Sequence, residues 1–158
     1  MPYSISTLLT RNLHDVFGEN DPTRRRAAVD EIFTEDCVFY EPKAVYRGRE
    51  EIDRVAGAIK ATHPDFRYQP IAAPEELGDG GRIQWVSGRP GEPPAYAGTD
   101  FIIARDGRIA AVYLFSTSCR RRASSSGAAR LERPVSDRRK FGGLSHSGLR
   151  AQPLLVHC

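Results

Sequence analysis

Two acidic residues of this chain lie in segments that favour β-structure and carry apolar neighbours. Glu41 ends the segment Cys37–Glu41 and directly precedes Pro42. Because side chains alternate along a strand, Cys37 and Phe39 share a face with Glu41 and surround the acid with apolar groups. Apolar surroundings disfavour an ionised carboxylate and raise its pKa toward neutrality, the range that suits proton transfer. The chemistry that such an acid offers is general acid–base catalysis.

The second acid, Asp100, belongs to a segment that otherwise carries Phe101, Ile102 and Ile103. If Phe101 and Ile103 face a cavity, alternation points Asp100 away from it, unless Gly98 marks a β-bulge. The structural alternative is an aspartate that pairs with an arginine or caps a turn at the rim of the sheet. We retain Asp100 as a second candidate.

The elements that position these acids are helical in the first half of the chain. Apolar residues recur at helical spacing from Ile5 to Phe17, and Gly18 provides a stop. Asp21-Pro22 is typical of a helix N-terminus, and a second helix follows through Phe33. Its three successive arginines, 24–26, are interpreted as a solvated face. A third helix is predicted from Glu50 to Thr62, ending before His63-Pro64.

After the third helix, the spacing of apolar residues changes from the helical period to the alternation that is typical of strands. Besides Cys37–Glu41 and a short extension at 44–48, the predicted strands are Phe66–Gln69, Arg82–Gly88, Tyr96–Ala104 and Arg108–Phe115. Asp106-Gly107 predicts a hairpin turn between the last two. The GDGG run at 78–81 lacks the Lys-Ser/Thr pair and the helix of a phosphate-binding loop, and is interpreted as a turn. We therefore predict an α+β domain with helices packed on a curved antiparallel sheet.

Composition and charge divide the chain near residue 115. Residues 1–115 carry 14 basic and 18 acidic residues, whereas 116–158 carry 9 and 2. We predict one domain at 1–115 and a basic, low-complexity, disordered tail at 116–158. The tail has three possible readings, which are an unstructured extension, an arm that binds nucleic acid, and a non-native reading frame. Nucleic-acid binding is not expected from any other part of the chain.

The whole sequence also gives expectations for the cellular location of the protein and for metal binding. No stretch approaches the ~20 apolar residues that span a bilayer, and the N-terminus lacks a secretory pattern, so we expect a cytoplasmic protein without a membrane segment. Three scattered cysteines favour reduced thiols over disulfides or metal ligands. His63 has no second and third ligand at metal spacing. We expect neither a metal nor a cofactor.

Three stretches together resemble the SnoaL-like branch of the NTF2-like superfamily, which includes ketosteroid isomerase-like proteins. They are AAVDEIFTEDCVFYEP (27–42), YRGREEI (46–52) and YAGTDFIIARDGRIAAVYLF (96–115). The resemblance implies a cone-shaped fold over residues 4–115 and a homodimer formed through the open face of the sheet. In relatives the last strand continues for a few more residues and the chain then stops. The segment that follows Phe115 here is therefore unusual for the family.

The resemblance also implies chemistry for the two acids. Glu41 matches the base of ketosteroid isomerase-like enzymes, which removes a proton next to a carbonyl. Asp100 matches an acid/base aspartate of SnoaL-like cyclases, although alignment through the DGRI turn puts Thr99 at the oxyanion-acid position of the isomerases. The first helix offers His14 and Phe17 where an isomerase places a tyrosine, which disfavours a steroid isomerase.

The predicted function is therefore cofactor-free proton transfer, of an isomerase, cyclase or lyase type, on a small apolar or aromatic ligand. Glu41 and Asp100 are the candidate catalytic residues. The candidate pocket residues are His14, Phe17, Phe39, Trp85, Thr99 and Tyr113. The alternative is a non-catalytic ligand-binding or dimerisation module of the same fold, in which Glu41 is a hydrogen-bonded structural acid. A functional basic tail is a third hypothesis.

Overall fold

The computed structural model describes residues 2–119 of the chain, which begin with a helical half. Its helices are α1 (Ile5–Arg11), the π-helical turn η1 (Asn12–Phe17), α2 (Pro22–Ile32) and α3 (Arg49–Thr62). The Ser4 side chain caps α1 by accepting a hydrogen bond from the Thr7 amide. Asp21 caps α2 through the amides of Thr23 and Arg24, as the Asp-Pro pair predicts.

The second half supplies most of one seven-stranded sheet. Its strands are β1 (Phe33–Glu41), β2 (Ala44–Arg47), β3 (Arg67–Pro70), β4 (Glu75–Leu77), β5 (Gly80–Gly88), β6 (Tyr96–Arg105) and β7 (Arg108–Ser118). The order across the sheet is β2-β1-β7-β6-β5-β3, and β4 pairs with the other half of β5. All pairs are antiparallel except β1 with β7, which is parallel. The predicted α+β class is confirmed.

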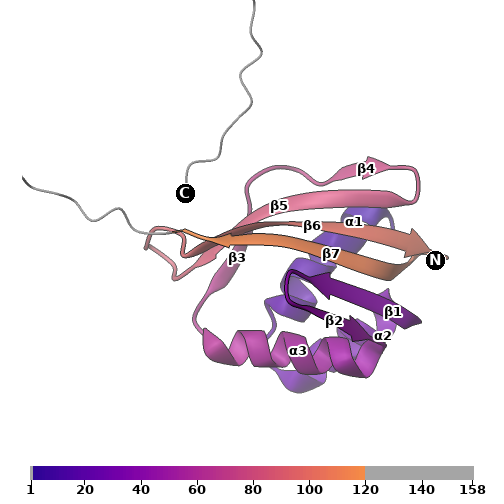
Figure 1. The fold of residues 1–158 in the computed structure, drawn as a ribbon, viewed down its shortest axis with the longest axis horizontal. Helices are drawn as coiled ribbons and strands as arrows, with labels where there is room; N and C mark the ends of the chain where they lie inside the picture. The colour runs from indigo at the N-terminus through magenta and orange to yellow at the C-terminus, as the bar shows by residue number, and fades with distance from the viewer. Residues whose placement is uncertain (1, 120–158) are drawn as a thin grey trace, which may run out of the picture. The chain divides into compact units, whose positions relative to one another are not determined.

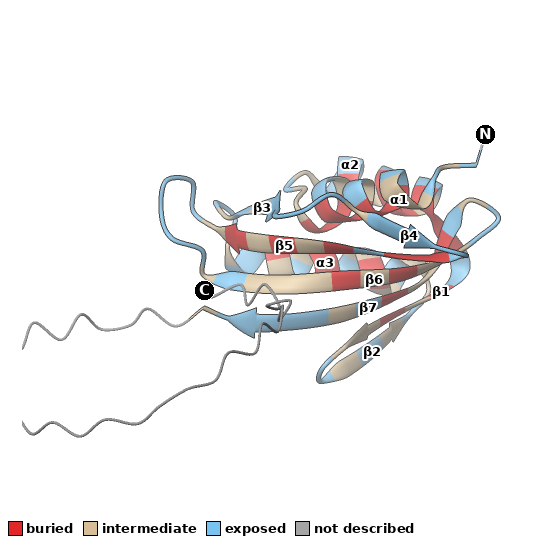
Figure 2. Cartoon of the chain, turned by 90° about the horizontal axis from the view of Figure 1, so that it is seen from above, coloured by how far each residue is buried: buried red, intermediate tan, exposed pale blue. Residues whose placement is uncertain are grey.

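The helices cover one face of the sheet and leave the other open (Figure 1). Buried positions gather on the sides of the helices and strands that face each other (Figure 2). The core between these layers contains fully buried side chains from both, including Leu8, Leu9, Val29, Ile52 and Ile102. Burial of these apolar side chains is the main force that holds the helices on the sheet.

Several predicted boundaries are wrong in instructive ways. The first helix is not α-helical to Phe17, because its last six residues widen into η1. Phe33 begins β1 and does not end α2. Strand β7 continues past the predicted domain boundary at 115, and Ser116, Thr117 and Ser118 pair with β6. The remaining predictions for the tail concern residues 120–158, which lie outside the described part of the chain.

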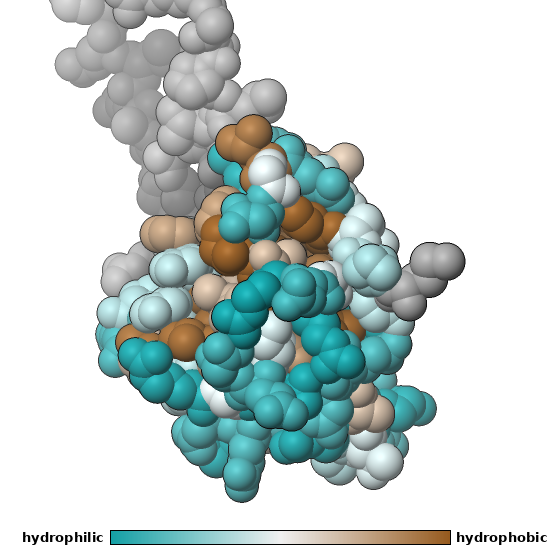
Figure 3. Space-filling model, turned by 90° about the vertical axis from the view of Figure 1, so that its right-hand side faces the viewer, coloured by the Kyte–Doolittle hydropathy of each residue, from teal (hydrophilic) through white to brown (hydrophobic). Residues whose placement is uncertain are grey.

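The surface on the side that faces right in Figure 1 is mostly hydrophilic, with apolar groups gathered mainly in its upper part (Figure 3). Within residues 2–119, no helix is long and apolar enough to cross a membrane.

One of the three successive arginines is part of the structure's interior. Arg25 is buried, and its Nε atom lies 2.8 Å from Oδ1 of Asp53 on α3. Arg24, by contrast, has a side chain that is 71% exposed, and it pairs with Glu19 at the surface. The interpretation of this run as a solvated face is therefore wrong for Arg25, which joins α2 to α3.

We predict that Arg25→Met lowers the free energy of unfolding by about 2 kcal/mol, because Asp53 loses a charged hydrogen-bond partner while remaining partly buried. The matched variant Arg24→Met should change it by less than about 1 kcal/mol, as expected of an exposed pair. Urea denaturation followed by the fluorescence of Trp85, the chain's one tryptophan, measures both. Equal losses in the two variants would contradict a structural role for the Arg25–Asp53 pair.

Candidate functional site

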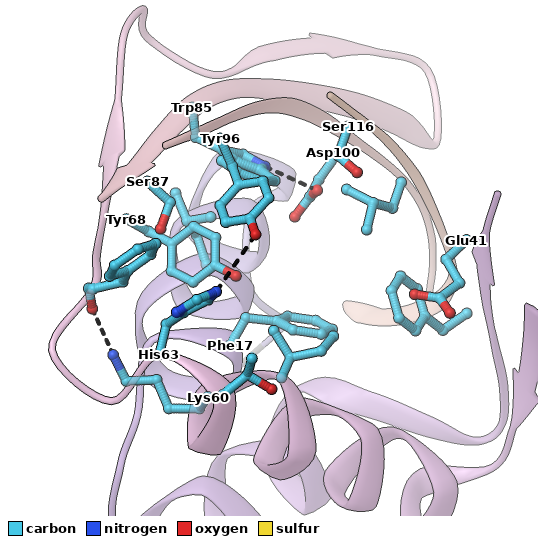
Figure 4. Close-up of a pocket in the computed structure, with 16 residues that line it drawn as sticks. Phe17, Glu41, Lys60, His63, Tyr68, Trp85, Ser87, Tyr96, Asp100 and Ser116 are labelled. Carbon is cyan, nitrogen blue, oxygen red and sulfur yellow. Dashed lines mark hydrogen bonds between the residues drawn. The ribbon is translucent and has the colours of Figure 1, made fainter. Parts of the chain in front are cut away.

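A cavity of about 300 Å³ lies between the curved inner face of the sheet and the helices (Figure 4). Aromatic and aliphatic side chains make most of its wall. They come from η1, β1, the end of α3, the segment between α3 and β3, and the strands β3 and β5 to β7, and include Leu13, Phe17, Phe39, Phe66, Tyr68 and Trp85. Polar and charged side chains make the rest of the wall, and two of them are carboxylates, Glu41 and Asp100.

Asp100 is one of the three most deeply buried of these polar groups, with Lys60 and Ser87. The residue is 4% exposed, and its carboxylate accepts hydrogen bonds from Nε1 of Trp85 at 3.0 Å and from Nδ2 of Asn12 at 3.2 Å. Burial raises the pKa of Asp100 to about 6, although the two donors favour the ionised form. The side chain can therefore both accept and donate a proton near neutral pH.

The arrangement in which Phe101 and Ile103 face the cavity and Asp100 points away from it is wrong. Asp100 faces the cavity together with the inward-pointing Ile102, and Phe101 lies on the opposite face of the sheet, where it contacts Tyr113. No bulge at Gly98 is involved, because the pairing of β5 with β6 runs in unbroken register past this residue.

Gly98 has a different role, which is to make room for Trp85. These two residues are direct partners across β5 and β6. A Cβ atom at position 98 would lie 2.5 Å from the indole ring, closer than van der Waals contact allows. The indole can lie over the β6 backbone, with its N–H toward Asp100, because residue 98 has no side chain.

Asn12 is a site residue that the sequence reasoning missed. It begins η1 and is fully buried, and its Oδ1 atom has no hydrogen-bond partner among the described residues. The available sequence indication is its position, since Asn12 lies four residues after Leu8 and four before Val16 on the apolar side of the first helix. A polar residue on such a face must find a buried partner.

Tyr68 is a second missed residue, and it adds a hydroxyl group to the cavity wall. Its ring packs edge-on against Trp85 with 4.9 Å between ring centroids. Burial, together with the nearby Asp100 carboxylate, raises the pKa of Tyr68 to about 12. The hydroxyl therefore keeps its proton at neutral pH and can serve as a hydrogen-bond donor.

Glu41 lies in the wall at some distance from Asp100 (Figure 4). It is half-buried at the end of β1, and its carboxylate accepts a hydrogen bond of 2.9 Å from the hydroxyl of Tyr46. That bond is the main reason why the pKa of Tyr46 is raised. Of the two alternatives for Glu41, the structure shows features of both, an acid on a cavity and an acid with a hydrogen-bonded partner.

The other predicted pocket residues divide into two groups. Phe17, Phe39 and Trp85 line the cavity. His14 is exposed on the outside of η1 and is not in the wall. Thr99 and Tyr113 are also outside the wall, because alternation in β6 and β7 points them to the open face of the sheet, where Tyr113 stacks on Tyr40. The pocket assignments of His14, Thr99 and Tyr113 are therefore wrong.

The far end of the cavity carries basic and aromatic groups from the last turn of α3 and the segment that follows it. Lys60 is 4% exposed, and its Nζ atom donates a hydrogen bond of 2.6 Å to the Phe66 carbonyl. Burial, followed by the repulsion of Arg67, lowers the pKa of Lys60. His63 stacks on Phe66, and its Nε2 atom lies 3.4 Å from the hydroxyl of Tyr96.

No group of three or more His, Cys, Asp or Glu side chains within residues 2–119 is arranged to hold a metal ion. The cavity wall offers two carboxylates, two tyrosine hydroxyls, a lysine and a histidine among apolar side chains.

Comparisons with solved structures show the same fold. A SnoaL-like family protein from Agrobacterium tumefaciens, provisionally described as an isomerase, has a TM-score of 0.67 and 24% identity, covering 72% of this chain and 97% of its own. A provisionally described polyketide cyclase from Sinorhizobium meliloti has a TM-score of 0.54 and 22% identity, covering 69% and 94%.

A third structure comes from Catenulispora acidiphila. It is a hypothetical protein with a ketosteroid isomerase-like fold in complex with trimethylamine, with a TM-score of 0.57, 17% identity and coverage of 71% and 86%. No curated protein matches the chain.

A family model settles the classification that these folds indicate. The model of the SnoaL-like domain matches residues 10–112, which include η1, the strands β1 to β6, the first part of β7, and both cavity carboxylates. The chain belongs to the SnoaL-like domain family.

Proposed function

We propose that this protein binds a small, largely apolar molecule in the cavity and moves a proton on it without a cofactor. The observation that carries this proposal is the Asp100 carboxyl group, which is buried in the cavity wall, held by two neutral donors, and has a pKa raised to about 6. Perturbed acids in concave apolar sites are typical of catalytic acid–base groups.

The proposed step is an enolisation. Ionised Asp100 accepts a proton from a carbon next to a carbonyl group, and the electron pair of the C–H bond moves into the new C–C double bond while the carbonyl oxygen becomes an enolate oxygen. Protonated Asp100 then returns the proton to the same or a neighbouring carbon. The hydrogen bonds from Trp85 and Asn12 keep the carboxylate in one orientation during both transfers.

Tyr68 is the candidate donor for the enolate oxygen. Its side chain lines the same cavity and packs against Trp85, the residue that holds Asp100. A protonated hydroxyl in an apolar site stabilises negative charge that develops on oxygen. Tyr68, on β3, would thus donate the hydrogen bond that a tyrosine of the first helix donates in the isomerases.

Glu41 is the second acid of the proposed site. Asp100 is favoured as the proton-transfer residue because it is deeply buried with a raised pKa, whereas Glu41 is only half-buried. The family resemblance favours Glu41 as the base. Substitution of each acid in turn separates these two assignments.

A non-catalytic binding protein is the second candidate, and the satisfied hydrogen bonds of both acids favour it. In that case the cavity holds a ligand, and Asp100 fixes the ligand's orientation without exchanging protons. The trimethylamine complex belongs to the Catenulispora acidiphila protein, and it is a reason to include amines among the ligands tested here.

We also propose a cytoplasmic homodimer formed through the open face of the sheet. An aromatic strip lies on this face, made by Tyr40, Phe101, Tyr113 and Phe115. Phe115 is 64% exposed in the single chain. Aromatic side chains exposed together on one sheet face are typical of a protein interface.

The first prediction tests proton transfer directly. Incubation of the protein in D₂O with aryl alkyl ketones or β-keto esters should speed deuterium incorporation at the carbon next to the carbonyl, as measured by proton NMR. Asp100→Asn should lower the enzyme-dependent rate by about 10²- to 10⁴-fold, because the variant cannot accept the proton. Asp106→Asn, at an exposed turn, is the matched control and should retain the native rate.

The same assay decides between the two acids. A loss in Glu41→Gln as large as that expected for Asp100→Asn, with Asp100→Asn unaffected, would transfer the role of base to Glu41. If compounds bind to the native protein but exchange no deuterium, only the second candidate, a non-catalytic binding protein, would remain.

The second prediction concerns the pH dependence of stability. Folding raises the pKa of Asp100 from 3.8 to about 6, so the folded state favours the protonated form. The stabilisation from that proton is present at low pH and is lost as the pH rises through about 6. The ionised residue therefore lowers the free energy of unfolding at pH 8 by up to about 3 kcal/mol relative to a neutral one.

Urea denaturation of the native protein and Asp100→Asn at pH 4.5 and pH 8 measures this effect. Asp100→Asn should gain stability relative to the native protein between the two pH values, whereas Asp106→Asn should not. A stability difference between native protein and Asp100→Asn that is the same at both pH values would show that burial does not shift the pKa of Asp100.

The third prediction addresses the proposed dimer. Sedimentation velocity should show a dimer for the full chain and a monomer for Phe115→Glu, because the new charge lies within the aromatic strip. Leu77→Glu, which replaces an 86% exposed apolar side chain on β4, is the control and should remain dimeric. A native protein that sediments as a monomer at micromolar concentration would contradict the interface.

A further inference from the structure

The cavity carries negative charge that no cation of the described residues neutralises. Asp100 has two hydrogen-bond partners, Trp85 and Asn12, and both are neutral. Glu41 has the neutral hydroxyl of Tyr46. Within residues 2–119, neither carboxylate forms an ion pair, whereas ten other carboxylate–arginine contacts do occur. Arginines are plentiful in this fold, yet none is directed to the cavity acids.

The cationic residue of the wall does not supply the missing charge. Lys60 directs its Nζ atom to the Phe66 carbonyl, at the opposite side of the cavity from Glu41 and away from Asp100 (Figure 4). The field inside the cavity near the two acids is therefore negative at neutral pH.

Aromatic rings surround this negative region. Phe17 and Phe39 lie together with 5.2 Å between ring centroids, and Phe39 stacks on Tyr46, the partner of Glu41. Tyr68 and Trp85 form a second aromatic pair beside Asp100. The faces of aromatic rings attract cations, and the attraction is stronger where water is excluded.

From this combination we propose that the ligand of the cavity carries a positively charged nitrogen, either a protonated small amine or a quaternary ammonium group. The inference rests on the proposed function, since it describes the substrate class of the same cavity. An ammonium group replaces part of its lost hydration with a cavity carboxylate and neighbouring aromatic rings, which is the compensation that a buried cation requires.

A positive charge on the substrate also suits the proposed chemistry. An ammonium group close to a carbonyl stabilises the enolate that forms when Asp100 removes the neighbouring proton, because opposite charges attract strongly in a cavity of low polarity. Amino ketones and related amine-bearing carbonyl compounds thus become the substrate class to examine first.

Two probes of equal shape and different charge test the inference. Choline carries a trimethylammonium group, and 3,3-dimethylbutan-1-ol has a neutral carbon in place of that nitrogen. Titration of each into the full chain, followed by the fluorescence of Trp85 and by ligand-observed NMR, gives two dissociation constants. We expect choline to bind at least about tenfold more tightly than the alcohol.

Substitution of each acid in turn shows which carboxylate causes the preference for choline over the alcohol. In Asp100→Asn the advantage of choline should fall to less than about threefold, while the affinity for the neutral alcohol stays within about twofold of the native value. That unchanged affinity shows that the variant keeps its cavity. Glu41→Gln should reduce the advantage by a smaller factor, because Glu41 is less deeply buried. Asp106→Asn should keep it in full.

Equal or tighter binding of the alcohol would overturn the inference and leave the proposed proton transfer intact, because a cavity that binds the neutral probe still exists. A choline advantage that persists in Asp100→Asn would overturn it as well. Tighter binding of 3,3-dimethylbutyrate than of choline would assign the cavity to anions held by Lys60. Failure of every probe to bind, together with the absence of deuterium exchange, would overturn both the inference and the proposed function.

Discussion

Burial of the Asp100 carboxylate under the sheet is the constraint that arranges the rest of the site. A charged oxygen away from water requires hydrogen-bond donors, and the donors come from two separate layers. Trp85 reaches Asp100 from the neighbouring strand, and Asn12 reaches it from the helical layer. Each donor has its own structural requirement, since Trp85 needs the bare backbone of Gly98 and Asn12 begins the π-helical turn that departs from α-helical geometry. The acid, the glycine and the irregular helix therefore form one arrangement.

The sequence predicts the fold much better than it predicts the site. Helical periodicity, the Asp21-Pro22 start and the Asp106-Gly107 turn are local patterns, and they locate most elements to within a few residues. The misplaced boundaries arise where a tertiary contact overrides the local pattern. Strand β7 continues through Ser116 to Ser118 because β6 offers paired backbone groups there, although the side chains are small and polar. Arg25 is buried because Asp53, far along the chain, provides its partner.

The errors in the site follow from a choice that alternation alone cannot make. A strand with Asp100 and Ile102 on one face and Phe101 and Ile103 on the other has apolar residues on both sides. Hydrophobicity then does not say which of the two faces meets the helices. Asn12 and Tyr68 were missed for another reason, since each gains its role from a residue far away in sequence. Only their presence on apolar faces indicates that they need a partner.

The two faces of β6 also explain why register matters for this protein. The inner face carries the acid that lines the cavity, and the outer face carries Phe101, part of the aromatic strip with Tyr113. A shift of β6 by one residue would turn an ionisable group to the open face and place a phenyl ring beneath the helices. Such a shift is opposed at three points, because Trp85 needs Gly98 as its partner, Asp100 needs Trp85 and Asn12, and the β6–β7 turn closes at Asp106 and Gly107 with positive φ at both residues. The hydrogen bonds that hold the acid thus also hold the sheet in the register that separates the chemistry of the cavity from the aromatic surface outside it.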